Sequence, residues 1–419
     1  MPKIVLATFG SLGDLHPKIA LGIELKRRGH DVTIAAMEFY REKIGMTGLG
    51  FAPMAPHLDP EADIAKDLMD QNTGTETILR HLIMPSLPQM YEELISATAD
   101  ADLLVTGEIV YAVKSVVEKT GIPWVSTTLA PISLFSSYDP PIPPPVPWFE
   151  RLRFMPAAFH RFVFSLAKLQ TNSWLSDYRK FRRGLGLSED HDPIFDGKYS
   201  DLLHLVMFSK MLGEPQPDWP KAAEQTGFCF YDGQADSGQM PDGLEEFLDT
   251  GEPPIVFTLG SAAVMDPGSF FDESIAAAKM LGRRAVVLYG VYNNAPAGLT
   301  KEVVGYGYAP FSKLFPRAAC VVHQAGVGTT GQVLRAGVPH LIMPYGHDQP
   351  DNAARCRRAG VAEIIPRGEY NARPVSVLLG KLLSDPDYTE NARRAAAVIQ
   401  AEGGTETACD AIESILSRA

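Results

Sequence analysis

Short apolar runs alternate with amphipathic segments near the amino terminus of the chain. The run KIVLATFG (residues 3–10) predicts a buried strand, and a glycine-rich turn leads from it into an amphipathic helix over 18–30 and a second strand over 31–37. The same order of strand, helix and strand returns over residues 101–131. Such β-α-β units build parallel sheets.

A second alternation begins near residue 253, after a stretch rich in Gly, Pro, Asp and Gln over 213–252 that we interpret as a linker. Its predicted strands cover 253–261, 283–290, 319–326 and 340–346, and its predicted helices cover 270–282 and 329–337. The sequence therefore predicts an α/β protein of two Rossmann-like, doubly wound domains, 1–212 and 253–399, facing a central cleft. A last helix, at about 400–419, could pack back on the first domain. In such sheets ligands bind beyond the carboxyl ends of the strands.

Composition narrows the class of protein. The 419 residues are 45% apolar and 21% charged, with a formal net charge of −12, which argues against a general nucleic-acid binder. The beginning MPKIVLATFG is typical of a strand rather than of a signal peptide, and no apolar run reaches the roughly 18–20 residues that span a bilayer. Four widely spaced cysteines without a C-x-x-C pair fit a reducing compartment. We therefore expect a cytoplasmic protein.

Residues 321–352, VVHQAGVGTTGQVLRAGVPHLIMPYGHDQPDN, contain the strongest chemical signal. A helix that starts after the glycines would present free N–H groups and a partial positive charge to a phosphate. Gly326 and Gly328 would allow a close approach, Thr329 and Thr330 would add hydroxyl donors, and His323 could donate to the same anion. Alternatively, His323 only ends a strand and Thr329 only caps a helix.

Asp348 and Gln349 stand at the next predicted strand-to-helix turn. A carboxylate beside a carboxamide suits the vicinal hydroxyls of a sugar, although Asp348 could equally cap a helix that has Pro350 in its first turn. Together, the two turns favour a ligand that joins a sugar to a nucleoside diphosphate.

The segment HQAGVGTTGQVLRAGVP…MPYGHDQPDNAARCRRAGVA resembles the donor-binding signature of family 1 glycosyltransferases of the GT-B fold, especially bacterial rhamnosyltransferases and antibiotic or sterol glycosyltransferases. The resemblance extends to FTLGS, to YAPFSKLFPRAACVVHQAG and to FGSLGDLHPKIALGIELKRRGHDVT. It covers most of the second half and the first fifty residues, whereas residues 50–250 carry almost none of it.

The resemblance implies a role for each matching residue. Ser261 would face the diphosphate, Tyr308 and Phe311 would hold the nucleobase, and Gln332 takes the place of a ribose-binding Glu. The other implied donor contacts are Gly13, Gly328, Thr329 and Thr330 around the phosphates and Asp348 and Gln349 on the transferred sugar. The chain departs from the family at Gln324, where many relatives have a second histidine. The diphosphate contact could therefore come from His323, Gln324 or both.

Transfer with inversion needs a base for the acceptor hydroxyl. The family places this base in the first strand-to-helix turn, where Asp14 matches, and His16 is an alternative with a more suitable ordinary pKa of about 6.5. Structural roles would be a helix cap for Asp14 and a first-turn position for His16. Glu108 ends a predicted strand and could be a partner carboxylate or a solvated loop residue.

Other ligands find less support. The turn at Asp14 lacks the full G-x-G-x-x-G fingerprint and the paired acid of an NAD site. The triplets DHD (190–192) and DPD (385–387) imitate a metal site but fit loop chemistry. We expect no metal and no cofactor, only a UDP- or dTDP-linked sugar as co-substrate.

Residues 151–183 carry eight Lys or Arg and one acid, Asp177, interleaved with aromatic residues. This segment could lie on a membrane surface, but a helix that lines an aromatic acceptor pocket is favoured because the arginines cluster at the segment ends. The sequence predicts an inverting, metal-independent transferase that moves a glucose- or rhamnose-type hexose to a hydroxyl of a small hydrophobic natural product, flavonoid, sterol or lipid. The alternatives are a non-catalytic glycosyltransferase-like auxiliary protein and a nucleotide-sugar 2-epimerase of the same fold. No obligatory protein partner is evident.

Overall fold

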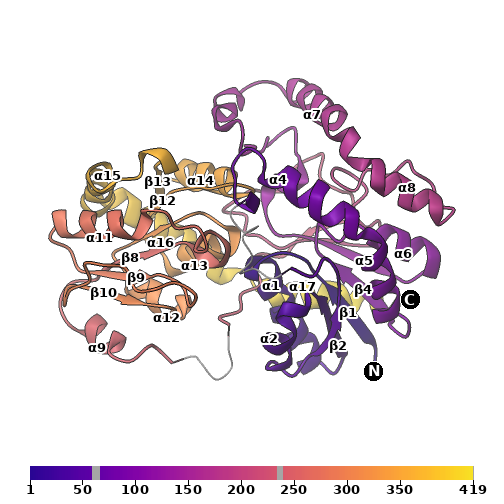
Figure 1. Ribbon diagram of the computed structural model, residues 1–419, viewed down its shortest axis with the longest axis horizontal. Coiled ribbons are helices and arrows are strands. Elements are labelled where there is room, and N and C mark those ends of the chain that lie inside the picture. Colours follow the sequence, from indigo (N-terminus) through magenta and orange to yellow (C-terminus); the bar gives the residue numbers. More distant parts are fainter. Residues whose placement is uncertain (59–66, 234–238, 419) are drawn as a thin grey trace.

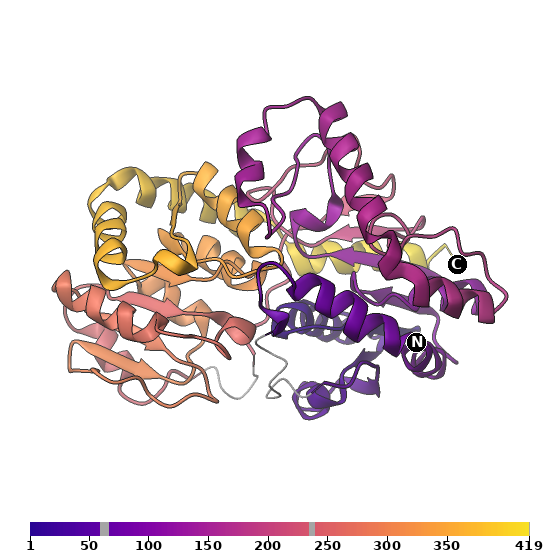
Figure 2. The same cartoon turned by 45° about the horizontal axis from the view of Figure 1, so that its top comes forward.

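The computed structural model describes residues 1–58, 67–233 and 239–418, and it contains two parallel sheets, each covered by helices (Figure 1). The two lobes lie side by side in both views, with the first half of the chain in one lobe and most of the second half in the other (Figure 2). The predicted α/β class with two doubly wound domains is confirmed.

The first sheet has the strand order β3-β2-β1-β4-β5-β6-β7, and its neighbouring strands are parallel. Its strands are β1 (Lys3–Ala7), β2 (Asp31–Ala36), β3 (Gly50–Pro53), β4 (Leu103–Thr106), β5 (Trp124–Thr128), β6 (His204–Val206) and β7 (Ala223–Gln225). The direction of the strand order reverses between β1 and β4, which is where such sheets bind ligands.

The second sheet has the order β10-β9-β8-β11-β12-β13, again with parallel neighbours. Its strands are β8 (Ile255–Thr258), β9 (Ala285–Leu288), β10 (Val303–Tyr306), β11 (Cys320–His323), β12 (His340–Ile342) and β13 (Ala362–Ile364). The strand order reverses between β8 and β11. The predicted strands at 319–326 and 340–346 therefore end at the ligand edge of this sheet.

Helices cover both faces of each sheet. In the first half they are α1 (Leu12–Arg27), α2 (Arg41–Gly45), α4 (Gly74–Glu76), a π-helical stretch (Thr77–Ile83), α5 (Met84–Ala97), α6 (Val113–Thr120), α7 (Ala157–Thr171) and α8 (Ser176–Gly184). In the second half they are α9 (Leu244–Asp249), α10 (Gly260–Ala263), α11 (Phe270–Met280), α12 (Phe311–Leu314), α13 (Val327–Ala336), α14 (Gln349–Arg358), α15 (Ala372–Ser384), α16 (Pro386–Ala401) and α17 (Gly404–Leu416). Short 3₁₀ turns lie at Glu38–Tyr40, Pro131–Leu134, Pro147–Leu152, Asn172–Leu175, Phe315–Arg317 and Arg367–Glu369.

Two helices begin earlier than the sequence pattern predicted. α1 starts at Leu12 rather than at residue 18, because the Ser11 side chain caps it, and Pro17 is accommodated inside the helix. α13 starts at Val327 rather than at residue 329. Both shifts bring glycines of these turns, Gly13 and Gly328, into the first turn of a helix.

The predicted linker is too broad. β7 forms the edge of the first sheet, and α9 contributes Leu244 and Leu248 to a core of the second domain. The connection between the two sheets therefore lies between Gln225 and Leu244, within the predicted range of 213–252. The strand was missed because three residues, AEQ, carry no detectable alternation of polar and apolar positions.

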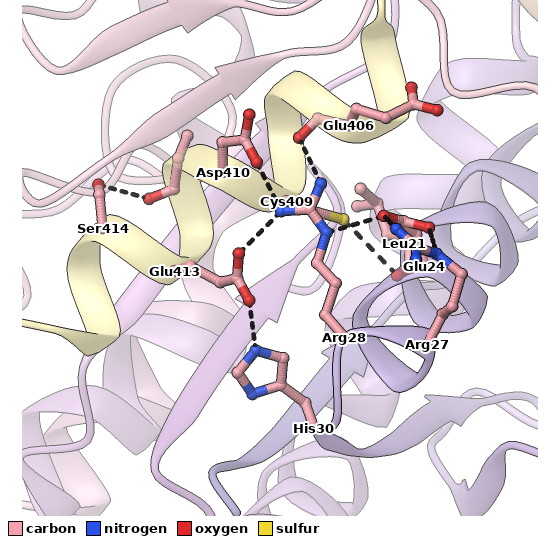
Figure 3. A network of polar contacts seen from close by, with 11 residues as sticks. Leu21, Glu24, Arg27, Arg28, His30, Glu406, Cys409, Asp410, Glu413 and Ser414 are labelled. Atoms are coloured by element: carbon pink, nitrogen blue, oxygen red, sulfur yellow. Dashed lines mark hydrogen bonds and ion pairs between the residues drawn. The ribbon is translucent and has the colours of Figure 1, made fainter.

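The end of the chain returns to the first domain. α16 packs on α13 of the second domain, whereas Cys409 and Ile412 of α17 belong to the first core. Arg28, at the end of α1, binds Glu24 (2.8 Å) and Glu413 (2.7 Å), and His30 binds the same Glu413 (2.9 Å; Figure 3). These contacts anchor α17 against α1.

The proline-rich segment over 138–150 belongs to the first half of the chain and contacts helix α14 of the second domain. Its Ile142 N–H donates to the Asp351 carboxylate of α14 (3.1 Å), and its Asp139 pairs with Arg355 of the same helix. Arg355 is almost fully buried and also binds Asp351 (2.8 Å). The beginning of α14 is thus held by contacts from the first domain. In the described part of the chain, no helix is both long and apolar enough to cross a membrane.

Candidate active site

Two helix N-termini face each other where the domains meet. α1 follows β1 of the first sheet and α13 follows β11 of the second. A Cβ atom placed on Gly328 would lie 3.9 Å from the Cα atom of Gly13, so the two helix starts nearly touch. Gly13, Pro17, Val327 and Gly328 line a small cavity together with Leu129, Met207, Phe228, Cys229 and Phe230. A Cβ atom at 3.9 Å is in ordinary van der Waals contact, so the two helix starts approach closely without a steric requirement for glycine at Gly328.

The N-terminus of α1 is capped from within its own turn. The Gly13 N–H donates to Ser11 Oγ (3.1 Å), and the Ser11 N–H donates to Asp14 Oδ2 (2.8 Å), which together form a capping box. Gly10 has a φ of +129°, and a Cβ atom there would collide with the Asp14 carboxylate. The capping role that was the alternative for Asp14 is therefore present, and the same arrangement holds its carboxylate against Gly10.

Burial raises the pKa of Asp14 to about 7. The negative charge of Glu108 contributes to this increase, while the hydrogen bond from the Ser11 N–H and the charge of Lys18 act in the opposite direction. A carboxylate that titrates near neutral pH can accept a proton efficiently, unlike one with an ordinary pKa near 4. This pKa is compatible with the predicted role of Asp14 as the base, which stays a prediction.

His16 has the opposite electrostatics. Burial and the charge of Lys43 lower its pKa to about 3, and its ring lies edge-on to Tyr231 with centroids 5.2 Å apart. Its Nε2 atom is buried and has no hydrogen-bond partner among the described residues. The ordinary pKa that made His16 attractive does not apply in this environment, so His16 is the weaker base of the two.

Lys18 is a buried lysine whose charge acts on Asp14, and the sequence pattern did not single it out. Lys18 is fully buried, its Nζ donates to Thr127 Oγ1, and burial lowers its pKa to about 8. Glu108 accepts a hydrogen bond from the Leu129 N–H (2.9 Å), and its charge acts on both Asp14 and Lys18. The available signal was the spacing of four residues between Asp14 and Lys18, which places both on one helix face.

The N-terminus of α13 is built differently. Within the described residues no side chain of its own first turn caps it, and the Val327 N–H donates instead to Asp348 Oδ2 (3.0 Å) from the next turn. Helix geometry leaves the amides of Gly328 and Thr329 without intrahelical acceptors. Thr330 is fully buried, and its Oγ1 has no partner in the described part of the chain. These groups suit an anion.

His323 is held inside the second domain through both ring nitrogens, and its contact with the diphosphate stays a prediction. The side chain is fully buried; its Nδ1 accepts from the Ala325 N–H (3.1 Å) and its Nε2 pairs with His340 Nδ1 (2.9 Å). Both ring nitrogens are therefore occupied inside the domain. Burial also holds the pKa of His323 well below its ordinary value.

Gln324 is the residue that reaches the loop. Cβ atoms placed on Gly260 or Gly326 would collide with the Gln324 amide, which therefore lies between α10 and the start of α13. Its Oε1 is buried without a partner among residues 1–58, 67–233 and 239–418. Of the possibilities left open by the sequence (His323, Gln324 or both), Gln324 has the side-chain atom that is free for an anion, and its contact with a diphosphate stays a prediction.

Asp348 and Gln349 lie beside the start of α13, and both make internal contacts. Asp348 Oδ2 accepts from Val327 and from Asn352 Nδ2 (2.7 Å), and Gln349 Oε1 accepts from the Tyr345 N–H (2.8 Å). Burial raises the pKa of Asp348 to about 7, and the charge of Asp14 contributes to the increase. The two carboxylates thus interact across the domain boundary. Contact of this pair with a sugar remains a prediction.

Asp232, from the connection between the two sheets, contacts two of the residues that were predicted to hold the nucleoside. Gln332 Nε2 donates to Asp232 Oδ1 (2.8 Å), and the Tyr308 hydroxyl donates to the Asp232 carbonyl (2.9 Å). Tyr308 is 43% exposed, which leaves ring surface for stacking. No sequence signal singled out Asp232, because it lies in the predicted linker.

Two predicted donor residues have less specific surroundings. Phe311 stacks on the buried Phe315 with centroids 4.4 Å apart, so that it belongs in part to the domain core. Ser261 is exposed in the first turn of α10 and follows Gly260, which lies against the Gln324 amide.

The acidic triplets have structural roles. Asp192 accepts from the Ile194 N–H (2.9 Å) in a turn, and Asp385 caps α16 by accepting from the Asp387 N–H (3.1 Å). Among the described residues, no group of three or more His, Cys, Asp or Glu side chains is arranged to hold a metal ion.

Comparisons with known proteins agree with this architecture. Residues 4–122 match the glycosyltransferase family 28 N-terminal domain, and residues 293–413 match the erythromycin biosynthesis protein CIII-like C-terminal domain. The O-mycaminosyltylonolide 6-deoxyallosyltransferase of Streptomyces fradiae is 31% identical over 98% of this chain and 97% of its own. The vancomycin aglycone glucosyltransferase of Amycolatopsis orientalis is 28% identical over 86% of this chain and 84% of its own.

Solved structures show the same fold. The glycosyltransferase of kitacinnamycin superposes with a TM-score of 0.73 at 22% identity, covering 99% of this chain and 100% of that one. The spinosyn rhamnosyltransferase superposes with a TM-score of 0.70 at 16% identity over the full length of both chains. The chain belongs to the family 1 glycosyltransferases of the GT-B fold.

Proposed function

We propose that this glycosyltransferase moves a hexose of the glucose or rhamnose type from a UDP- or dTDP-linked donor to a hydroxyl of a small hydrophobic acceptor, with inversion at the anomeric carbon. The observation that carries the proposal is the opposition of two unlike helix N-termini, at Gly13 and Gly328, between the domains. One side holds a carboxylate with a pKa of about 7, and the other offers free amides for an anion.

The chemistry follows from this opposition. The acceptor oxygen attacks the anomeric carbon and its proton passes to Asp14, while the bond from that carbon to the diphosphate oxygen breaks. The electron pair of that bond leaves with the nucleoside diphosphate, whose charge the start of α13 stabilises. Attack and departure occur on opposite faces of the sugar, because base and anion site belong to opposite domains.

The names of the relatives guide the choice of acceptor. Those relatives act on O-mycaminosyltylonolide, on the vancomycin aglycone and, in Arabidopsis thaliana, on a sterol 3β-hydroxyl. Structures of two proteins of this fold are described as complexes with thymidine diphosphate. We therefore place this chain's acceptor among hydroxylated natural products or sterols, and its donor among UDP- and dTDP-sugars.

Thermal unfolding followed with UDP- and dTDP-sugars identifies the donor, and mass spectrometry with a panel of macrolides, sterols and flavonoids then identifies the product. The anomeric configuration of the product, read from NMR couplings, tests inversion. Absence of transfer together with donor binding would favour the auxiliary-protein alternative, and conversion of the donor sugar at C2 without acceptor would favour the 2-epimerase.

We further propose that transfer needs no divalent metal and no cofactor, because the first turn of α13 can neutralise the leaving diphosphate by itself. Activity should persist in excess chelator. Complete loss of transfer in chelator, restored by magnesium or manganese, would contradict this part of the proposal.

Helix α7 suggests how a hydrophobic acceptor reaches the protein. One face of α7 lines a cavity of about 260 Å³, with Phe164 on the helix and Phe135 and Phe195 opposite. The adjacent face is open to solvent, with Phe162 61% and Leu169 71% exposed. We propose that the cavity accepts part of the acceptor, as the sequence favoured, and that the open face touches anionic membranes through its apolar residues and surrounding arginines.

Co-sedimentation with phosphatidylcholine vesicles, with and without phosphatidylglycerol, tests the membrane contact. Combined Phe162→Ser, Leu166→Ser and Leu169→Ser substitutions should abolish sedimentation with anionic vesicles. Met280→Ser with Val377→Ser, which removes equally exposed apolar side chains from the second domain, should not. Loss of self-association instead of vesicle binding would show that this face binds a second copy of the chain.

A further inference from the structure

The turn that connects β11 to α13 contains a strained residue. Ala325 is fully buried and has a φ of +70°, a left-handed conformation that residues with a side chain rarely adopt. Side chains hold the backbone on both sides of this residue. The Ala325 N–H donates to His323 Nδ1 (3.1 Å), and the Ala325 carbonyl accepts from Asn352 Nδ2 (2.9 Å). Such strain persists only where the surroundings impose it.

The hydrogen bonds define the tautomer of each histidine. Because His323 Nδ1 accepts from an amide, its proton must be on Nε2, which donates to His340 Nδ1 at 2.9 Å. His340 therefore also carries its proton on Nε2. The rings are nearly parallel with centroids 5.1 Å apart, and both side chains are fully buried. Burial lowers the pKa of His340 to about 3, so that the pair is neutral at physiological pH.

The hydrogen-bond network continues to the Val327 N–H, the first amide of α13. Asn352 Nδ2, which holds the Ala325 carbonyl, also donates to Asp348 Oδ2 (2.7 Å), and that oxygen accepts from the Val327 N–H (3.0 Å). Each step in this path is a hydrogen bond with a fixed direction. The path runs from β12, through the strained turn, to the helix start that faces the cleft.

We propose that His340 is a positioning residue for the donor site. By accepting from His323 Nε2–H, it selects the tautomer whose Nδ1 holds Ala325 in its strained conformation, and it thereby aims the free amides of α13 at the diphosphate. The proposal rests on the assignment of α13 to the diphosphate. It assigns a function to a buried histidine pair that takes no part in proton transfer.

Two substitutions at one position separate hydrogen bonding from packing. His340→Asn keeps an acceptor near the position of Nδ1, whereas His340→Leu fills similar space without one. Val322→Ala, in the equally buried neighbouring strand position, is the packing control. We expect His340→Leu to raise the Kd for UDP or dTDP, measured by calorimetry, at least tenfold. His340→Asn should stay within about threefold of wild type, and Val322→Ala should lower Tm with little change in Kd.

Nitrogen-15 NMR of the histidine rings gives a readout independent of ligand. His323 should be in the neutral Nε2–H tautomer in the wild type, and a mixture of tautomers is expected in His340→Leu. The positioning role would be overturned if His340→Leu bound the diphosphate with wild-type affinity. Equal losses of affinity in His340→Leu, His340→Asn and Val322→Ala would also overturn it. Failure of the wild type to bind either diphosphate, with the expected tautomer present, would instead contradict the proposed function.

Discussion

The two helix N-termini that meet between the domains come from the same local unit, a parallel strand followed by a glycine turn, yet they are capped in opposite ways. α1 supplies its own capping box through Ser11 and Asp14. α13 is held by Asp348 from a neighbouring turn, with the Gly328 and Thr329 amides left free of intrahelical acceptors.

This difference explains how one kind of turn can serve two chemical roles. Where the cap is internal, the capping carboxylate occupies the start of the helix, and we propose that it acts there as the base. Where the cap comes from elsewhere, the helix start is available for a diphosphate. The source of the cap, rather than the glycine pattern, distinguishes the two turns.

The largest expected effect is that of removing the base. Asp14→Asn can still accept from Ser11 and so preserve the cap, but it cannot take a proton. Turnover should fall by about two to four orders of magnitude, the usual range for a general base, with donor Kd unchanged. His16→Ala should cost much less. If instead the His16 variant is inactive and Asp14→Asn retains most activity, Asp14 is only a cap.

On the other side of the cleft, Asp348→Ala and Gln349→Ala should both weaken sugar-dependent steps. We expect about a tenfold loss in kcat/KM for each, in line with one hydrogen bond to a charged or buried group. Only Asp348→Ala should also weaken binding of the free nucleoside diphosphate, because it removes the acceptor of Val327. Calorimetry with UDP and dTDP checks this, and equal losses of diphosphate affinity would refute the assignment of Gln349 to the sugar.

The raised pKa of Asp14 also affects stability. The unfolded carboxyl has a pKa near 4 and the folded one about 7, so the folded protein binds more protons between these values. The contribution of Asp14 to the free energy of unfolding therefore decreases as pH rises from 4 to 7. Asp14→Asn should raise Tm at pH 8 and have little effect at pH 4. Calorimetric scans measure both variants, and the exposed control Asp201→Asn should show no such difference between the two pH values. A lower Tm of Asp14→Asn at pH 8 would contradict a raised pKa of the Asp14 carboxyl.

The smallest expected effect is on the cap itself. Ser11→Ala removes the acceptor of the Gly13 N–H and should lower the free energy of unfolding by about 1 kcal/mol. Chemical denaturation measures the change. A loss of diphosphate affinity in this variant would show that the two helix starts are not separate in function.

The sequence was most informative where a feature depends on neighbouring residues. The strands around β1 and β11 were predicted because buried parallel strands are continuous apolar runs. The helix starts at Leu12 and Val327 were missed because the pattern of apolar residues does not include the glycine turns.

Features that depend on tertiary contacts could not be predicted. The choice between His323 and Gln324 for the anion stayed open because a sequence does not tell whether the end of a strand points into the core or out of it. Lys18 and Asp232 were missed because their partners come from other segments, Thr127 and Gln332 respectively.

The pH dependence of kcat/KM tests the central claim, that the self-capped turn holds the base, most directly. We predict an acid limb with a midpoint near 7, because the Asp14 carboxyl must be ionised to accept the proton. In Glu108→Gln the midpoint should move to lower pH, because the charge of Glu108 helps to raise the pKa of Asp14. A rate that stays constant down to pH 5 in the wild type, or a midpoint that does not respond to Glu108→Gln, would contradict the account.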